Sequence, residues 1–488
     1  MVLLLWNIAV NTMQMRIGGT ETGAMAGKVL DVRNPATGEI IESVPSGTGD
    51  DVGSAVGAAG DACGTWGKKT PRERGTILFH AAQRVREQHK DLARLLTMEQ
   101  GKPLKEALDE VRGFANILEF YAGLSSHSSG EAIRLGAVGD GIVIREPLGV
   151  CGAIIPWNMP VLIMGWKIGP ALLAGNTMVL KPASTTPLTC LKLAAILDRA
   201  GLPPGVLNVI TGPGEEVGEA IIRHQAIKKI SFTGDTATGE KIRKLGSLNQ
   251  KELVLELGGS DPMIVMDDAD LRTAVEGAIR GRFYNAGQTC TAVKRLYVHE
   301  KIADHFTREL KDRVEALTVG NGLGAKVDMG PLNSAGQRER IAVMVESVRS
   351  ADEGTIVTGG CEMRGKTFEN GNFYRPTLVA GVEPESRLVT EEVFGPVLPV
   401  MTIPDLATAI REANNTRYGL GASIWTRDIG NVRRFFDEVH AGIVWVNRHL
   451  TVPPEVPFGG VNASGIGREN GQDALDGYSR TKTLLLGW

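Results

Sequence analysis

The sequence predicts an α/β protein with two doubly wound parallel-sheet halves and a small β arm. Short runs rich in β-branched residues alternate with segments of helical length, and this alternation restarts after Gly258-Gly259. Strands separated by helical crossovers pair in parallel, because each crossover returns the chain to the same edge of the sheet. A chain of 488 residues is long enough for two large domains, each with its own core.

The first predicted helix begins at a capping box. Thr70-Pro71-Arg72-Glu73 combines a Thr N-cap, a proline at the first helical position and a glutamate at the third. Apolar residues recur at helical spacing as far as Leu96, and Gly101 is a typical stop. We therefore expect one helix from Pro71 to just before Gly101.

Five strands and four helices are predicted in the rest of the first half. The strands are expected at 150–155, 177–180, 206–210, 229–232 and 253–256. The helices are expected at 160–174, 187–200 with Thr186 as its cap, 216–224 and 237–246. A second alternating run begins at Pro262 and includes a strand at 296–299. The boundary between the halves is therefore predicted near Gly258-Gly259.

The arm is predicted from a stretch that interrupts the helical pattern. Residues 132–146 are typical of a hairpin that turns around Gly139-Asp140-Gly141. The tail at 481–486 also has strand character and could pair with this hairpin. A projecting hairpin of this kind is suited to subunit assembly, so a homodimer or homotetramer is expected.

The apolar run at residues 2–10 is too short to cross a membrane, which takes about 20 residues. No basic residue precedes it and no small-residue cleavage site follows, which argues against a secretory signal. We interpret it as a non-structural extension or the product of an early start codon. No membrane association is expected.

Composition excludes several other classes of protein. The 53 Lys+Arg and 56 Asp+Glu residues give a net charge of −3, so no basic surface for nucleic acid is expected. The five cysteines form no CxxC pair, which argues against a disulfide framework and against a zinc site. We therefore expect a cytoplasmic protein without a bound metal.

Two residues are candidates for covalent chemistry. Cys290 follows a predicted helix through a glycine-containing loop, although a single cysteine is more often an inert buried residue. No histidine lies near it in the sequence, so a carboxylate would have to act as the base. Glu256 ends an apolar strand just before two glycines, and the carboxyl ends of parallel strands are where ligands bind. The alternative for Glu256 is a solvated strand end.

Three further loops follow predicted strands. Asn158 in PWNMP could donate to an oxyanion or could simply cap a helix. Lys181 and Ser184 in LKPAS could meet a ribose or a phosphate. The segment FTGDTATG opens a helix whose N-terminus would attract phosphate, but Glu240 stands where a Walker A loop needs lysine. Each signal is weak alone.

Seven motifs taken together are specific. PWNMP, LKPAS, FTGDTATG, LELGG, NAGQTC, EEVFGPV and PFGG occur in this order. From about Met15 onward the chain resembles the NAD(P)-dependent aldehyde dehydrogenase superfamily, in its hydrolytic, non-acylating branch. The resemblance implies a dinucleotide-binding domain at 1–131 and 150–257, a catalytic domain at 258–472, and an oligomerisation arm at 132–149 and 473–488.

The resemblance also implies a role for each matching residue. Cys290 would attack the aldehyde, Asn158 and the Cys290 N–H would hold the oxyanion, and Glu256 would activate the water that hydrolyses the thioester. Glu469 would lie on a proton path. The dinucleotide would be held by Ile154, Pro156, Trp157, Lys181, Ser184, Gly234, Thr236, Leu257, Glu392 and Phe394. The aldehyde would be lined by Met159, Trp166, Tyr284 and Phe458.

Departures from the family pattern refine these expectations. NAD-preferring members carry Glu at the position of Ser184, where a carboxylate would repel a 2′-phosphate, so Ser184 favours either NADP use or dual use of both dinucleotides. Asp235 replaces a common serine beside the pyrophosphate and is expected to point away. Tyr284 argues against substrates with a free carboxylate, because relatives that take them often carry Arg there. An aromatic-lined pocket instead suits an apolar medium-chain or aromatic aldehyde.

Two alternative functions stay open. A coenzyme A-acylating relative would pass the thioester to a thiol, but that group lacks the carboxylate found here at Glu256. A non-catalytic structural member of the family is disfavoured by the intact set of Cys290, Glu256 and Asn158.

Overall fold

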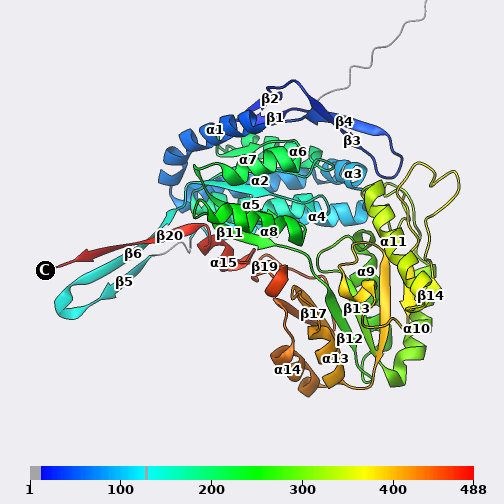
Figure 1. Cartoon of the computed structure of the whole chain (residues 1–488). Coiled ribbons are helices and arrows are strands. Elements are labelled where there is room, and N and C mark those ends of the chain that lie inside the picture. Colours follow the sequence, from blue (N-terminus) through cyan, green and yellow to red (C-terminus); the bar gives the residue numbers. More distant parts are fainter. Residues whose placement is uncertain (1–12, 127–129, 488) are drawn as a thin grey trace, which may run out of the picture.

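The computed structural model describes residues 13–126 and 130–487, which form two helix-flanked sheets and a narrow arm (Figure 1). The apolar run predicted as an extension, residues 2–10, lies outside the described residues. The two sheets confirm the predicted α/β class. Within the described part of the chain, no helix has the length and apolar character needed to cross a bilayer.

The first sheet has eight strands in the order β19-β11-β10-β7-β8-β9-β1-β2. Its centre, from β11 to β9, is parallel, whereas β19 and β1 pair antiparallel at the two sides. The bounds are β1 (Met15–Ile17), β2 (Thr20–Thr22), β7 (Val150–Ile154), β8 (Thr177–Lys181), β9 (Leu207–Val209), β10 (Ile227–Thr233), β11 (Glu252–Glu256) and β19 (Gly465–Ile466). All five strands predicted in this half are therefore present.

The second sheet has seven strands in the order β14-β15-β16-β13-β12-β17-β18, parallel except at β14. The bounds are β12 (Asp261–Val265), β13 (Val293–His299), β14 (Thr355–Thr358), β15 (Thr377–Ala380), β16 (Val397–Ile403), β17 (Gly421–Trp425) and β18 (Ile443–Val446). The chain enters this sheet after Gly258-Gly259. It later returns to the first sheet through β19, so the segment predicted as 258–472 contributes to both sheets.

Helices cover both sheets (Figure 1). Those of the first half are α1 (Gly49–Lys68), α2 (Pro71–Glu87), α3 (His89–Gln100), α4 (Leu104–Leu124), α5 (Pro160–Ala174), α6 (Leu188–Arg199), α7 (Glu219–Arg223) and α8 (Thr236–Ser247). The later ones are α9 (Leu271–Phe283), α10 (Glu300–Glu315), α11 (Ala335–Ala351), α12 (Arg387–Thr390), α13 (Leu406–Asn414), α14 (Ile429–Glu438) and α15 (Gly471–Asp476). Strands β3 (Val29–Arg33) and β4 (Ile40–Pro45) form a separate hairpin.

Three local predictions were wrong. The expected helix up to Gly101 is two helices, α2 and α3, because Gln88 leaves helical geometry at φ −103° and ψ 12°. Thr186 does not cap α6, since the first free amides of that helix donate to the Glu99 carboxylate on α3. The helix expected at 216–224 begins as a π-turn at 214–218 and becomes α7 only afterwards. The break at Gln88 lies in a polar run, where the spacing of apolar residues gives no signal. The cap of α6 depends on a long-range contact with Glu99.

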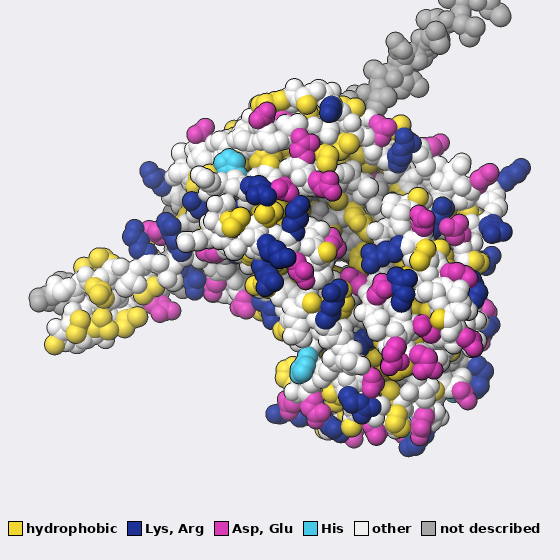
Figure 2. All heavy atoms as spheres, viewed as in Figure 1, with side chains coloured by type: hydrophobic (Ala, Val, Ile, Leu, Met, Phe, Trp, Pro, Cys, Tyr) yellow, Lys and Arg dark blue, Asp and Glu magenta, His cyan; other side chains and the backbone are white. Residues whose placement is uncertain are grey.

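The arm is confirmed as a three-stranded antiparallel sheet in the order β20-β6-β5. Strand β5 (Glu131–Arg134) turns back into β6 (Asp140–Pro147), and β20 (Ser479–Leu486) pairs along the whole of β6. The turn occupies residues 135–139, slightly before the predicted centre. Apolar side chains gather along this arm in Figure 2, and six of them are about 40% or more exposed: Ile133, Leu135, Val138, Ile144, Leu484 and Leu485.

Candidate active site

A cleft of ≈ 680 Å³ lies at the carboxyl ends of the first sheet's strands. It is lined from the first half by the ends of β7, β8 and β10, and from the second half by Cys290, Glu392 and Phe394. Every residue predicted to hold the dinucleotide, except Thr236, lines this cleft. Trp157 and Phe394 meet across it edge to face, with ring centroids 5.5 Å apart.

Lys181 and Ser184 lie at the end of the cleft formed by β8. The Lys181 ammonium donates only to its own neighbour's carbonyl, Pro182 O, at 3.0 Å, and burial lowers the pKa of Lys181 to about 8. Among the described residues, no carboxylate pairs with this ammonium. Ser184 donates its hydroxyl to Gly212 O at 3.0 Å. Glu215 lines the same cleft, so the end that holds Lys181 carries charges of both signs.

The chain also leaves space and unpaired polar atoms for a dinucleotide. A Cβ at Gly258 would lie 2.3 Å from the Glu392 carboxylate, so only glycine lets that carboxylate approach the backbone. The buried hydroxyls of Thr233 and Thr236 have no hydrogen-bond partner in the described chain. Contrary to the expectation that it points away, Asp235 also lines the cleft, and its carboxylate caps α8 by accepting from Thr238 N at 2.9 Å. These residues fit a nicotinamide dinucleotide.

Glu392 is held at the junction of the two halves. Its carboxylate accepts from Gly259 N at 3.1 Å and lies 3.3 Å from the Lys294 ammonium. Lys294 is wholly buried, and it also donates to the carbonyls of Thr289 and Cys290. Lys294 was not predicted as a site residue, although its position four residues after Cys290 could have indicated it.

Cys290 is half-buried and lines the cleft. Burial raises the pKa of its thiol to about 12, and the nearby Lys294 charge opposes that shift. The residues before it are unusual, because Asn285 and Ala286 have φ values of 51° and 54°. Positive φ is costly for residues with a Cβ and is concentrated at functional sites.

Asn158 faces the segment that carries Cys290. Its side-chain amide donates to Gln288 O at 2.9 Å, and it is 4% exposed. It does not cap α5, whose N-cap is Met159. One amide hydrogen of Asn158 is used in this contact, so a second remains for an oxyanion.

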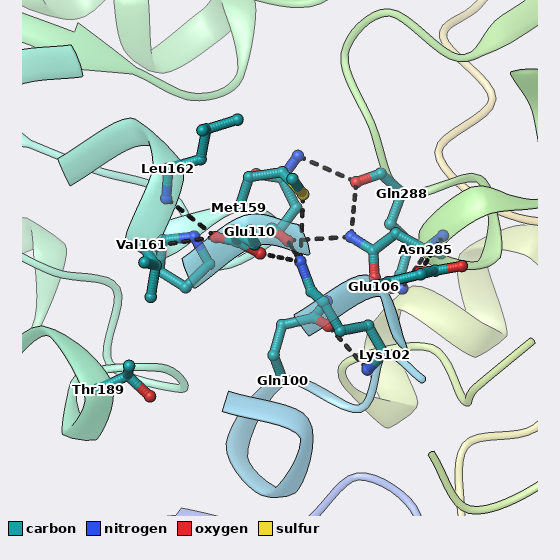
Figure 3. Close-up of polar contacts among 12 residues, drawn as sticks. Gln100, Lys102, Glu106, Glu110, Met159, Val161, Leu162, Thr189, Asn285 and Gln288 are labelled. Atoms are coloured by element: carbon teal, nitrogen blue, oxygen red, sulfur yellow. Dashed lines mark hydrogen bonds and ion pairs between the residues drawn. The ribbon is translucent and has the colours of Figure 1, made fainter. Parts of the chain in front are cut away.

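A buried polar network contacts Asn158, and we call it the wall. It consists of Lys102, Glu106, Glu110 and Asn285, which are labelled in Figure 3. The Lys102 ammonium donates to the Glu110 carboxylate and to Asn158 O, the latter at 2.8 Å. Glu110 also accepts from Val161 N and Leu162 N, at 2.9 and 3.1 Å, and so binds the first turn of α5.

The same network also includes Asn285, which precedes Cys290 in the chain. Asn285 donates its side chain to Asn158 O at 2.9 Å, and its backbone N–H donates to Glu106 at 2.8 Å. Burial raises the pKa of Glu106 to about 8. None of Lys102, Glu106 and Glu110 was predicted, because no short motif marks them.

Glu256 and Glu469 lie next to the cleft rather than in its lining. Glu256 ends β11 and is 2% exposed, and neither carboxylate oxygen has a partner among the residues the structure describes. Burial, and then Glu469, raise the pKa of Glu256 well above its usual range. A Cβ at Gly459 would lie 2.7 Å from Glu256, which explains the first glycine of PFGG. Glu469 accepts from Lys167 and Ser231, at 2.6 and 2.9 Å.

The four residues predicted to line the aldehyde are in three places. Trp166 and Phe458 pack together, with ring centroids 5.0 Å apart. Met159 contacts Lys102 through its sulfur, at 3.1 Å. Tyr284 lines a separate cavity of ≈ 410 Å³ between α4 and α9, together with Lys105 and Arg280.

Comparison with known proteins identifies the class. The family model for the aldehyde dehydrogenase family matches residues 22–484. A phenylacetaldehyde dehydrogenase from Pseudomonas fluorescens is 42% identical over 487 residues, covering 97% of this chain and 96% of that protein. The fold and site thus define a nicotinamide-dependent oxidoreductase. The chain belongs to the aldehyde dehydrogenase family.

Two solved structures share the whole fold. An NADP-dependent enzyme of E. coli is 39% identical with a TM-score of 0.95, covering 98% of this chain and 99% of that one. A betaine aldehyde dehydrogenase of Staphylococcus aureus, solved with NAD+, is 35% identical with a TM-score of 0.94, covering 97% of this chain and 94% of that one. One of these neighbours is thus NADP-dependent, and the other binds NAD+.

Proposed function

We propose that this aldehyde dehydrogenase oxidises an apolar medium-chain or aromatic aldehyde to the carboxylic acid by covalent catalysis at Cys290. The cleft carries this proposal, because it brings Cys290 and Asn158 together with the residues expected to hold a dinucleotide. A nicotinamide dinucleotide supplies a hydride acceptor when bound. Trp157, Glu392 and Phe394 are the residues we expect around its nicotinamide end.

Cys290 as a thiolate would add to the aldehyde carbon and form a thiohemiacetal oxyanion. Asn158 and the Cys290 N–H would donate to that oxyanion, which forms close to both. Loss of hydride from the same carbon would leave a thioester on the sulfur. Anchoring of Asn158 by the Lys102 network supports this role, because a fixed donor need not reorganise when the charge develops.

Glu256 would act as the general base for hydrolysis of the thioester. A base works best when its pKa lies near the working pH, and burial beside Glu469 moves Glu256 in that direction. The proton it takes would leave toward Lys167 and Glu469, which are joined by a buried ion pair. Release of the acid would then restore the Cys290 thiol.

For the substrate, the paired rings of Trp166 and Phe458 support an apolar aldehyde. The Pseudomonas fluorescens relative, by its name, acts on phenylacetaldehyde. For the cofactor, two features support NADP over NAD: Lys181 has no carboxylate partner among the described residues, and Ser184 stands in place of a glutamate.

The arm supports assembly into a homo-oligomer. Its exposed apolar residues would bury against a second copy of the chain, since exposed apolar surface on this scale favours association. Whether the assembly is a dimer or a tetramer is answered by the mass of the particle in solution.

One assay tests the whole proposal. Phenylacetaldehyde, hexanal and betaine aldehyde are each supplied with NAD or NADP, with and without coenzyme A, and the absorbance of reduced nicotinamide is followed. We expect the highest kcat/KM with phenylacetaldehyde or hexanal and NADP, and no dependence on coenzyme A. A strict requirement for coenzyme A would instead identify an acylating enzyme, and no turnover with any pair would favour the structural alternative.

A further inference from the structure

The segment that carries Cys290 is fixed by side chains that lie outside it. Gln288 O accepts from Asn158, Thr289 O accepts from Lys294, and Thr291 O contacts His449. Cys290 O also accepts from Lys294. Four consecutive carbonyls are therefore bound by buried side chains.

Because a peptide unit is planar, these contacts also fix the direction of the Cys290 N–H. In a trans peptide the C=O and the following N–H point in opposite directions. Thr289 C=O shares its peptide plane with Cys290 N–H, so the 3.1 Å bond from Lys294 to Thr289 O directs that N–H away from Lys294. The Cys290 N–H is the backbone donor that the proposed function assigns to the oxyanion.

Solvent does not screen the charge of Lys294. Its side chain is wholly buried, and the groups facing it are Glu392 at 3.3 Å, two carbonyls and the ring of Phe394, 5.9 Å to the centroid. Asp261, also buried, lies close enough for Lys294 to lower its pKa, which burial nonetheless raises to about 7. Histidine 449 adds no charge, because burial lowers the pKa of His449 to about 4.

We propose that Lys294 is a positioning residue that orients the Cys290 N–H toward the aldehyde and places a fixed positive charge beside the Cys290 thiolate. This inference rests on the proposed function of Cys290 as the nucleophile. His449 completes the anchoring as a neutral group. Since a carbonyl can only accept, Nε2 of His449 carries the proton toward Thr291 O, and Nδ1 accepts from Ser423 Oγ at 2.9 Å.

The test measures the rate of Cys290 alkylation by iodoacetamide against pH in the full-length protein without cofactor, with the labelled peptide identified by mass. Lys294→Met removes the charge and the hydrogen bonds while keeping the length of the side chain. Loss of the charge should raise the pKa of Cys290 by about one unit, so alkylation at fixed pH should slow about tenfold. With cofactor present, kcat should fall more than KM rises, because the oxyanion donor acts mainly in the transition state.

Two variants serve as controls. Lys301→Met removes a lysine that pairs with Asp267 on the surface and should leave the alkylation profile unchanged. Lys294→Arg retains the charge and should preserve most of the wild-type profile. Should Lys294→Met not fold, Lys294→Gln keeps a donor there without charge, and the same slowing is required of it.

The outcomes separate this inference from the proposed function. An alkylation profile equal to wild type in folded Lys294→Met or Lys294→Gln overturns the role of Lys294, even if Cys290 proves essential. Full activity in Cys290→Ala would overturn the proposed function itself, whatever Lys294 does.

Discussion

The cleft and the wall behind Asn158 differ in whether their polar groups are paired, although Asn158 belongs to the lining of one and contacts the other. In the cleft, Lys181 has no carboxylate partner and the hydroxyls of Thr233 and Thr236 are unpaired in the described chain. In the wall, Lys102 and Glu110 are wholly buried and bind each other and the backbone. The cleft therefore has polar groups that are free to bind a ligand, whereas the paired groups of the wall hold Asn158 in one position.

The largest expected effect falls on the boundary between the two regions. Cys290→Ala should lower aldehyde oxidation by at least about a thousandfold, because the nucleophile is lost. Dinucleotide affinity, measured by quenching of tryptophan fluorescence, should be nearly unchanged, since the cleft is intact. Turnover within tenfold of the wild type would remove Cys290 from the mechanism.

Breaking the wall should cost stability. Glu110→Gln leaves Lys102 as a buried unpaired charge and weakens the cap of α5, so the free energy of unfolding should fall by about 3–5 kcal/mol. Urea unfolding measures this loss. The matched control is Glu119→Gln on the same helix, where the pair with Arg86 is partly exposed and should be worth about 1 kcal/mol or less. Equal losses in the two variants would mean that the wall has no special role.

Glu256→Gln should separate the two chemical steps. Hydride transfer does not need this base, so we expect a burst of about one reduced cofactor per site followed by turnover slowed about a hundredfold. In the wild type, deacylation should rise with pH as Glu256 loses its proton, through a pKa above the usual glutamate range. That rise should be missing in the variant. Rapid-mixing absorbance across pH measures both features, and an absent burst would contradict the role of Glu256.

The smallest effect should come from changing the cleft alone. Ser184→Glu places a carboxylate near Lys181 and the expected 2′-phosphate, where repulsion between like charges costs on the order of 1–4 kcal/mol. The kcat/KM ratio for NADP over NAD should fall at least about tenfold, while stability stays unchanged. A wild type that already rejects NADP would show that Ser184 does not face the 2′ position.

Local patterns in the sequence predicted the cleft far better than the wall. The strands β7, β8 and β11 and the motifs at their ends are short, contiguous signals, so Asn158, Lys181 and Glu256 could be located from them. The pairing of β20 with β6 could also be predicted, since both runs have strand character.

The wall could not be predicted, because its contacts join residues far apart in the sequence. Nothing near Lys102 indicates that it contacts Asn158. The same holds for two contacts outside the wall, the cap of α6 by Glu99 and the ion pair of Lys167 with Glu469. A buried lysine and an exposed one look alike in a sequence, and only packing distinguishes them. For the same reason, the sequence does not reveal that Tyr284 lines a different cavity from the one that holds Cys290.

The late return of the chain to the first sheet has a consequence for the order of synthesis. β19 closes the edge of β11, and β20 closes the edge of β6, yet both follow all seven strands of the second sheet in the chain. Until then the nascent chain carries two unpaired strand edges and cannot complete either sheet. Open edges of this kind are sites of aggregation, so the N-terminal half depends on strands that are synthesised after the second sheet, and a chain truncated before β19 would leave both edges exposed.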